Sequence, residues 1–223
     1  MFVAIFCYDG QIMIIKTNFP LREITTFKLG GLAKYYLQTS VPEEMLAGIL
    51  TAQERKIKYL ILGGGSNVVF GDRGFNGLVI HFTGAKLNSK NFEFLDANQG
   101  RSLNNSQRTV LVELSAGLNW HEVVKKLSSL GLAGTEKMSA IPGNVGGFVV
   151  GNAGAYGQNI ANLVQWVEIF DGQSIRKIKN KDCFLPYEQR KAVLEAIQYV
   201  DEVIPEKNWE QKVNDIKKYK ADI

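Results

Sequence analysis

The stretch Leu62-Gly63-Gly64-Gly65-Ser66-Asn67-Val68 follows an apolar run at residues 58–62 that predicts a short β-strand. Three successive glycines have no Cβ, so a ligand can approach their backbone closely. Consecutive N–H groups in such a turn can form a concave nest for phosphate oxygens. Ser66 and Asn67 add a hydroxyl and an amide to the same place. A tight turn that binds nothing is the alternative interpretation of these residues.

The common nucleotide-binding motifs do not fit this stretch. A P-loop needs a lysine after its last glycine, and none follows here. The dinucleotide fingerprint of the Rossmann fold needs a third glycine where Val68 stands, and a helix after it. If the loop binds phosphate, it does so in another fold.

Composition excludes several classes of function. The net charge is +4 without a basic run, so we expect no nucleic-acid partner. Cys7, Cys183, His81 and His121 have no metal-ligand spacing, so we expect no metal site and assign all but His121 to structural roles. For His121, at the start of a helix, a surface position is favoured over a catalytic one. Free thiols indicate a cytoplasmic protein, and no apolar run is long enough for a membrane span.

Periodicity and turn residues predict the first elements. We expect a β-hairpin from residues 2–7 and 11–15, a strand at 34–38, a helix at about 43–55 and strands at 58–62 and 77–82. Ser40-Val41-Pro42-Glu43 has the pattern of a capping box. The pair Gly30-Gly31 predicts a plain turn or a close approach of two backbones, and the turn is favoured. Strand, helix and strand then deliver the glycine stretch at a strand end, where α/β folds place ligands.

The next elements are predicted by similar signals. Residues 88–107 are polar and predict a surface loop, and residues 109–115 alternate as a strand. Asn119 then begins a helix that ends at Gly131 in the C′ position. Its expected apolar face consists of Val123, Val124, Leu127 and Leu130.

Residues 134–157 are too rich in glycine for the interior of an ordinary helix or strand. They also contain apolar side chains that we expect to be buried: Ile141, Val145, Phe148, Val149 and Val150. A flexible linker would carry serine and charged residues instead. The pattern favours a backbone that wraps closely around a large flat ligand.

Four motifs, in order, resemble the FAD-binding part of the UDP-N-acetylenolpyruvoylglucosamine reductases (UDP-N-acetylmuramate dehydrogenases) over about residues 17–180. They lie at residues 26–31, at 62–68, at 115–120, and at 141–147 with 152–157. The resemblance implies an α+β fold of the PCMH type with FAD between two subdomains, at 17–86 and 87–183. Residues 1–16 would be an N-terminal extension.

The resemblance also implies a site and a reaction. The loop of Gly63, Gly64, Gly65, Ser66 and Asn67 would hold the pyrophosphate of FAD. The residues implied to line the rest of the cofactor are Ser115, Ala116, Gly117, Ile141, Pro142, Gly143, Val145, Gly146, Gly147, Asn152, Gly154, Ala155, Tyr156 and Gly157. For Tyr156, flavin contact and core packing are equally compatible with the sequence. In the family, NADPH reduces the flavin, and the hydride passes to the enolpyruvyl group of a UDP-sugar during peptidoglycan synthesis.

The chain departs from the family at its catalytic residues. The motif like Gly-Ser-Phe-Phe-Lys-Asn-Pro, which carries the proton-donating serine in a C-terminal substrate domain, is not found in the sequence. After Cys183, Tyr187 is followed by Glu188, where the family has arginine. We therefore expect the substrate domain to be missing, and we transfer no catalytic residue to this chain.

Residues 184–223 resemble an internal part of glycerol-3-phosphate cytidylyltransferases, through Tyr187-Glu188-Gln189-Arg190-Lys191 and residues 199–212. They predict a helix at 187–197, a strand at 199–204 and a helix at 208–219. The His-x-Gly-His motif of that family is not found in the sequence, which makes nucleotidyl transfer the least favoured function. The chain is thus expected to be a composite, either a flavin reductase by family or an FAD-binding pseudoenzyme. The sequence does not indicate an oligomeric state.

Overall fold

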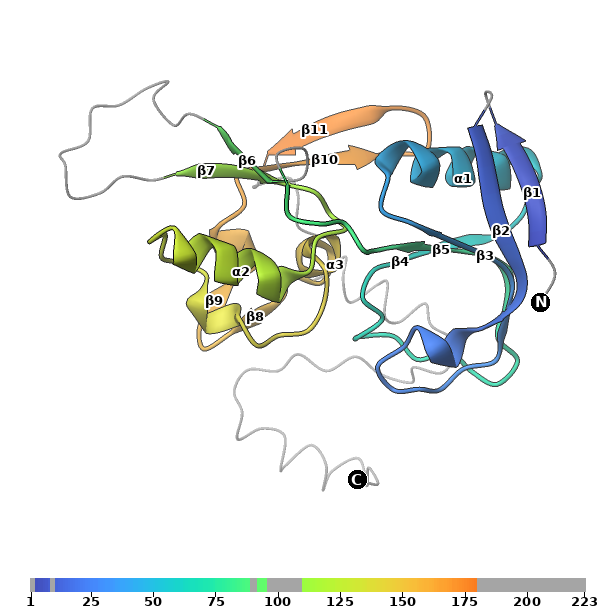
Figure 1. Ribbon diagram of the computed structural model, residues 1–223, viewed down its shortest axis with the longest axis horizontal. Coiled ribbons are helices and arrows are strands. Elements are labelled where there is room, and N and C mark those ends of the chain that lie inside the picture. The colour runs from blue at the N-terminus through green and yellow to red at the C-terminus, as the bar shows by residue number, and fades with distance from the viewer. Residues whose placement is uncertain (1–2, 9–10, 89–91, 96–109, 180–223) are drawn as a thin grey trace, which may run out of the picture. The chain divides into compact units, whose positions relative to one another are not determined.

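The computed structural model describes residues 3–8, 11–88, 92–95 and 110–179 (Figure 1). The chain divides into the units Met1–Lys181 and Asp182–Ile223, and the described residues all belong to the first. The elements expected at 187–197, 199–204 and 208–219, together with Cys183, lie outside the described residues. The first elements in chain order are β1 (Val3–Tyr8), β2 (Gln11–Pro20), η1 (Leu21–Glu23), β3 (Leu32–Thr39), α1 (Pro42–Glu54), β4 (Tyr59–Leu62) and β5 (Phe75–Phe82).

These strands form one five-stranded sheet in the order β1-β2-β3-β5-β4. The hairpin predicted at the N-terminus is confirmed, because β1 and β2 pair in antiparallel fashion through Tyr8 and Gln11. β2 is also antiparallel to β3, whereas β5 lies parallel to β3 on one side and to β4 on the other. The carboxyl ends of β3, β5 and β4 therefore meet at one edge of the sheet, where the glycine stretch begins after β4.

Alternation along the strands gives the sheet two buried faces. α1 lies over one face (Figure 1), and the buried residues there are Met13, Ile15, Leu37, Ala47, Ile49, Ala52, Leu78 and Ile80. The buried residues on the other face are Phe19, Leu21, Ala33, Tyr36, Leu62, Phe70 and Val79. The second face thus includes Leu62, the residue immediately before the first of the three glycines, Gly63.

The start of α1 differs from the prediction. Val41 is the N-cap, and it makes no side-chain cap hydrogen bond, so the capping box predicted from Ser40 is wrong. Instead, the Val41 N–H donates to Thr39 Oγ1 at 3.0 Å, and Thr39 Oγ1 donates to Glu44 Oε2 at 2.6 Å. The hydroxyl at the start of the helix thus comes from Thr39, one residue before the predicted Ser40. Thr39 lies at the end of β3, and its side chain is buried against the helix start.

The pair Gly30-Gly31 is a close approach of two backbones, and the favoured prediction of a plain turn is wrong. A Cβ on Gly31 would lie 2.1 Å from the carbonyl oxygen of Asp72, which no side chain tolerates. The Gly31 N–H also donates to the carbonyl of Gly71 at 3.0 Å. These contacts join the segment before β3 to the loop between β4 and β5.

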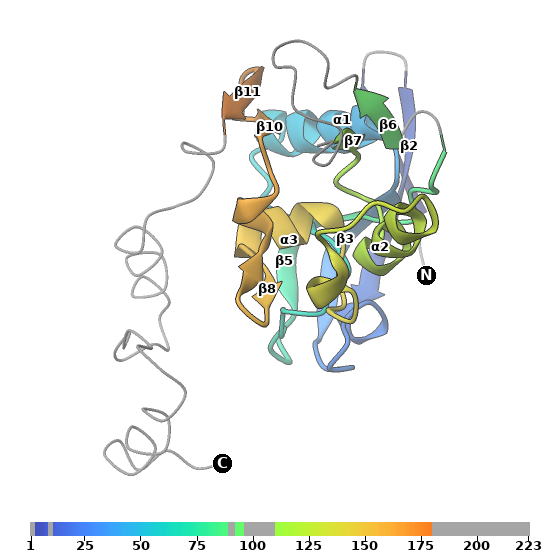
Figure 2. The ribbon, with the colours of Figure 1, turned by 90° about the vertical axis from the view of Figure 1, so that its left-hand side faces the viewer.

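The remaining elements are β6 (Phe92–Leu95), β7 (Leu111–Leu114), α2 (Trp120–Ser129), η2 (Glu136–Met138), α3 (Val145–Gly151), β8 (Gly154–Ala155), β9 (Gln158–Asn159), η3 (Ile160–Asn162), β10 (Trp166–Phe170) and β11 (Ile175–Lys179). The surface loop predicted at 88–107 contains β6, which pairs with β7, so that prediction is wrong over 92–95. Figures 1 and 2 show α2 and α3 side by side, with Trp120 stacked on Phe148 at 4.7 Å between ring centroids. Tertiary packing therefore maintains structure that local sequence signals do not predict.

α2 follows its prediction closely. The side chain of Asn119 accepts from the Glu122 N–H at 3.2 Å, and Gly131 has the positive φ, +72°, of a C′ glycine. Val123, Val124 and Leu127 are buried as expected, but Leu130 is exposed because it lies past the last helical turn.

The glycine-rich segment contains α3, although its glycines argued against a helix. Val145 and Phe148 are buried as predicted, and Ile141 and Val149 are half-buried. Val150 lies on the outer face of α3 with 88% of its surface exposed, so the prediction that it is buried is wrong. The helix is short enough that packing of Phe148 on Trp120 outweighs the low helix propensity of glycine.

Candidate cofactor site

The glycine loop, defined as residues 63–67, leaves β4 at the carboxyl edge of the sheet. Gly65 has φ +65°, and a Cβ there would lie 2.0 Å from the carbonyl oxygen of Ile24. The carbonyl of Gly65 in turn accepts from the Thr26 N–H at 3.0 Å. Gly65 is therefore required by the fold, because it ties the loop to the turn that follows η1.

The amides of the glycine loop are available to a ligand. None of the backbone N–H groups of residues 64–67 donates a hydrogen bond to a residue that the structure describes. The Ser66 hydroxyl makes only a long contact, 3.5 Å, with the Gly64 carbonyl, and Asn67 is exposed. Successive unpaired amides beside a hydroxyl are an arrangement that can bind phosphate oxygens, and the binding of a pyrophosphate here stays a prediction.

Asn144 joins two separate segments, at residues 82–83 and at Gly117, beside this loop. Its side chain is 4% exposed, and its Nδ2 donates to the Gly117 carbonyl at 3.1 Å, the Thr83 hydroxyl at 3.1 Å and the Phe82 carbonyl at 3.3 Å. A Cβ on Gly64 would lie 3.2 Å from Asn144 Oδ1. The glycine loop thus packs directly on this asparagine, which the sequence analysis did not include among the site residues.

Backbone hydrogen bonds bring the motif at 115–120 against residues 141–147. The Gly146 N–H donates to the Ala116 carbonyl at 2.9 Å, the Val145 N–H to the Leu118 carbonyl at 2.9 Å, and the Trp120 N–H to the Gly143 carbonyl at 3.0 Å. The two segments approach each other closely at Gly146, since a Cβ there would lie 3.0 Å from the Ala116 Cβ. Gly143 also borders the loop, because its Cα would be 3.2 Å from a Cβ on Gly64. The motifs at 62–68, 115–120 and 141–147 therefore meet at one place, and the motif at 26–31 reaches them through the hydrogen bond from the Thr26 N–H to the Gly65 carbonyl.

The second part of the last motif, residues 152–157, makes no described contact with the glycine loop. Asn152 has a left-handed backbone at the end of α3, and its side chain accepts from the Ala161 N–H at 3.2 Å. Gly154 and Ala155 pair with Asn159 and Gln158 in a small hairpin. Tyr156, at its turn, is 85% exposed with φ +52°, which rules out core packing for its ring. The ring is free to contact a ligand.

His81 is the titratable side chain closest to the start of the glycine loop along the sheet, because β5 pairs it with Leu62 of β4. Burial lowers the pKa of its imidazole below the ordinary value, and a hydrogen bond to the Gly63 backbone partly opposes that shift. The Tyr36 hydroxyl lies 2.7 Å from Nδ1 of the same ring. The sequence predicted a structural histidine here, and it gave no signal for the partner.

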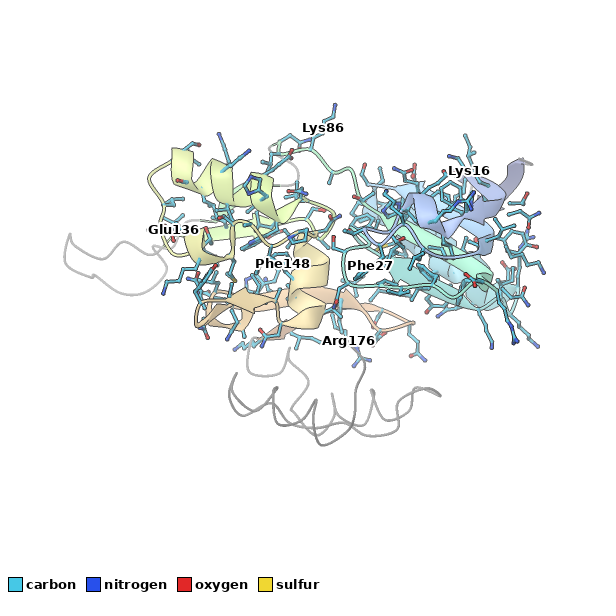
Figure 3. All side chains as sticks on the ribbon, turned by 90° about the horizontal axis from the view of Figure 1, so that it is seen from below. Lys16, Phe27, Lys86, Glu136, Phe148 and Arg176 are labelled. Atoms are coloured by element: carbon cyan, nitrogen blue, oxygen red, sulfur yellow. The ribbon has the colours of Figure 1, made fainter. Side chains whose placement is uncertain are left out.

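A polar cavity of about 490 Å³ opens on the same side of the sheet. Its lining includes Lys16, Tyr36, Gln38, Thr83 and Gly84. Figure 3 places Lys16 among the strands of the sheet and Phe148 on α3, in the other half of the described structure.

Within the described residues, no three His, Cys, Asp or Glu side chains gather to hold a metal ion. Nor does that part of the chain hold a helix long and apolar enough to cross a membrane.

Comparisons with known proteins agree with this geometry. The family model described as "FAD binding domain" matches residues 33–175. A second model, described as "Cytidylyltransferase-like", matches residues 159–223, so that likeness begins earlier than the residue 184 expected from the sequence. The two matches overlap at residues 159–175, which contain β10.

The relatives are reductases, and the chain spans about half of their length. The UDP-N-acetylenolpyruvoylglucosamine reductase of Streptomyces coelicolor is 33% identical over 81% of this chain and 43% of its own length. The one from Rubrobacter xylanophilus is 36% identical over 76% of this chain and 53% of its own length.

A solved structure shows the same fold. The UDP-N-acetylenolpyruvylglucosamine reductase of Thermus caldophilus superimposes with a TM-score of 0.53 at 23% identity, over 81% of this chain and 54% of that one. The α+β fold expected from the sequence and the resemblance to these reductases are both confirmed. Since the FAD-binding model covers well over half of the chain, the protein belongs to the FAD-binding domain family.

Proposed function

We propose that this chain binds FAD and derives from a reductase that uses NADPH to reduce a UDP-N-acetylglucosamine enolpyruvate in the cytoplasm. The observation that carries the proposal is the glycine loop, whose amides at 64–67 have no described protein partner and which packs on Asn144 and Gly143. Relatives named for the enolpyruvyl reductase reaction support the choice of substrate class, a nucleotide sugar.

In this proposal the backbone of residues 63–67 binds the pyrophosphate. The flavin and adenosine parts contact the region of 115–117, 141–147 and 152–157. The subdomains would run from 17 to 86 and from 87 to 183, with residues 184–223 as a cytidylyltransferase-like fragment. FAD, when bound, supplies the hydride acceptor and donor, and the residues of this chain bind it, orient it and exclude water.

We further propose that the chain alone does not complete the reductase reaction. The serine motif that donates the proton in the family is not in the sequence, and Glu188 stands where the family has arginine. Glutamate does not supply the positive charge that the family's arginine provides. The chain then acts as an FAD-binding module.

The test is the visible absorption spectrum of the purified chain after addition of FAD and desalting. Retained flavin bands are the expected result, and a colourless protein would contradict FAD binding. NADPH oxidation is then measured with and without the enolpyruvyl substrate. A rate that does not respond to the substrate is expected of a binding module, whereas a substrate-dependent rate would show that the chain is a complete reductase.

A further inference from the structure

The imidazole of His81, on β5, is buried beside the start of the glycine loop. Its side chain is 8% exposed, and Nδ1 lies 2.7 Å from the Tyr36 hydroxyl on the neighbouring strand. β4 and β5 are paired so that His81 is opposite Leu62, immediately before Gly63. A neutral imidazole has one N–H donor and one acceptor nitrogen. With Nδ1 accepting from Tyr36, the remaining N–H is available to the Gly63 carbonyl.

Tyr36 is itself held firmly. Its ring is 1% exposed and stacks on Phe19 with centroids 3.8 Å apart and planes within 7°. The hydroxyl borders the polar cavity and has one proton to donate; its 2.7 Å contact with His81 Nδ1 is shorter than its 3.3 Å contact with Gln38 Oε1, so we assign the proton to the histidine. The histidine is therefore anchored at one end to a residue that belongs to the core of the sheet.

Few charges surround this pair among the described residues. Lys16 on β2 lies with Nζ 5.8 Å from the Tyr36 ring centroid, and the charge of Glu23 in η1 acts on the Tyr36 hydroxyl. The ionisable side chain of β4 is Tyr59, which alternation places on the face of the strand opposite to Leu62, and residues 60–67 contain none. The protonation state of the ring is thus set mainly by its burial and its two hydrogen-bond partners.

We propose that His81 is a positioning residue for the cofactor loop: held by the Tyr36 hydroxyl, it donates to the Gly63 carbonyl and fixes the first glycine in its binding conformation. The inference rests on the proposed FAD binding. Three successive glycines lose more backbone freedom on ordering than other residues do. A loop that is already anchored loses less of it when the ligand binds, so affinity rises.

The experiment is a fluorescence titration of the apoprotein with FAD at about pH 7.5, for the wild type and matched variants. His81→Phe keeps the size of the ring but removes both hydrogen bonds, and we expect FAD to bind about fivefold to tenfold more weakly. His81→Gln retains an amide donor and should recover part of this loss. Tyr36→Phe should weaken FAD binding less than His81→Phe does. The variant with both substitutions should bind FAD no more weakly than His81→Phe, because Tyr36 acts on the loop only through its hydrogen bond to His81. Tyr59→Phe, on the exposed side of β4, is the control.

Repeating the titration at lower pH separates positioning from a merely structural role. Protonated His81 cannot accept from Tyr36, so wild-type affinity should fall as the pH decreases through the pKa of the folded-state imidazole, which burial lowers below the ordinary value of 6.5. His81→Phe should lose this dependence. The chain has two histidines, and His121→Gln should keep the wild-type profile. If His81→Phe fails to fold, the inference is tested by the pH dependence of FAD affinity in the wild type and by the FAD affinity of His81→Gln.

The outcomes distinguish this inference from the proposed function. Equal FAD affinity of wild type and His81→Phe, or an unchanged pH profile in His81→Phe, would overturn the inference and leave FAD binding intact. A wild-type protein that binds no FAD at any pH would overturn the proposed function and the inference together.

Discussion

Asn144 shows how one residue can hold the site together. Its Nδ2 is the donor that two segments share, through the Phe82 carbonyl and the Thr83 hydroxyl in one and the Gly117 carbonyl in the other. Asn144→Ala should lower the free energy of unfolding by about 1–3 kcal/mol, because buried acceptors lose their donor. Asn144→Asp should be worse at neutral pH, since a carboxylate would face two carbonyls. Urea denaturation measures both, with Asn162→Ala at an exposed position as the control. Wild-type stability in Asn144→Asp would contradict this account.

Gly65 and Gly84 test whether close approach or backbone conformation makes glycine necessary. Both have positive φ, +65° and +83°, but only at Gly65 would a Cβ meet a neighbour, the Ile24 carbonyl oxygen at 2.0 Å. Gly84→Ala should cost about 1–2 kcal/mol from φ alone. Gly65→Ala should cost clearly more and should also weaken FAD binding, because the loop must shift. Equal losses of stability in urea denaturation would show that the contact with Ile24 is unimportant.

At the scale of the element, the start of α1 depends on Thr39. Its hydroxyl accepts from the Val41 N–H and donates to Glu44, while the N-cap residue makes no side-chain bond. Thr39→Val preserves the shape of the side chain and should destabilise the protein by about 1 kcal/mol, the usual effect of losing a cap. Ser40→Ala, the residue that the sequence pattern favoured, should change stability by less than about 0.5 kcal/mol. The reverse order in chemical denaturation would restore the predicted capping box.

The elements with strong local signals were predictable. β3, α1, β4, β5 and α2 follow from alternation, helical spacing and the Asn119 cap. β6 and α3 were not, because β6 depends on pairing with β7 and α3 on the contact between Trp120 and Phe148. For the same reason the glycine loop could be proposed as a phosphate nest from its sequence, whereas the contacts of Asn144 could not be predicted. Its partners lie 27, 61 and 62 residues away, and only the folded chain brings them together.

At the scale of the whole molecule, stability should depend on pH in both directions. Burial lowers the pKa of His81 and raises that of Tyr36, with a further contribution from the charge of Glu23 to the latter. The unfolded chain therefore takes up a proton at His81 more readily, so stability falls as the pH decreases below the ordinary histidine value of 6.5. The unfolded chain also loses the Tyr36 proton more readily, so stability falls as the pH rises above 10.0.

Two exposed carboxyl groups extend the acid side of this profile. Backbone amides lower the pKa of Glu136, through its own N–H and that of Gly134, and the pKa of Asp171, through Ser174 and Gln173. The stability that these two groups contribute to the folded protein is present above their ordinary pKa values. It is lost as the pH falls toward their lowered pKa values in the folded state. Calorimetric melting temperatures from about pH 3 to 11 test the whole profile. His81→Phe should remove the decline just below 6.5, and a decline that persists in this variant would assign it to other groups.

The division of the chain leads to the last prediction. The FAD-binding match ends at residue 175 and the first unit at Lys181, while the cytidylyltransferase-like match continues to 223. The buried clusters on both faces of the sheet draw their described members from between Met13 and Ile80. A variant that ends at Lys181 should therefore keep its melting temperature within a few degrees and retain FAD after desalting. Loss of flavin, with folding preserved by circular dichroism, would show instead that residues beyond 181 contribute to the site.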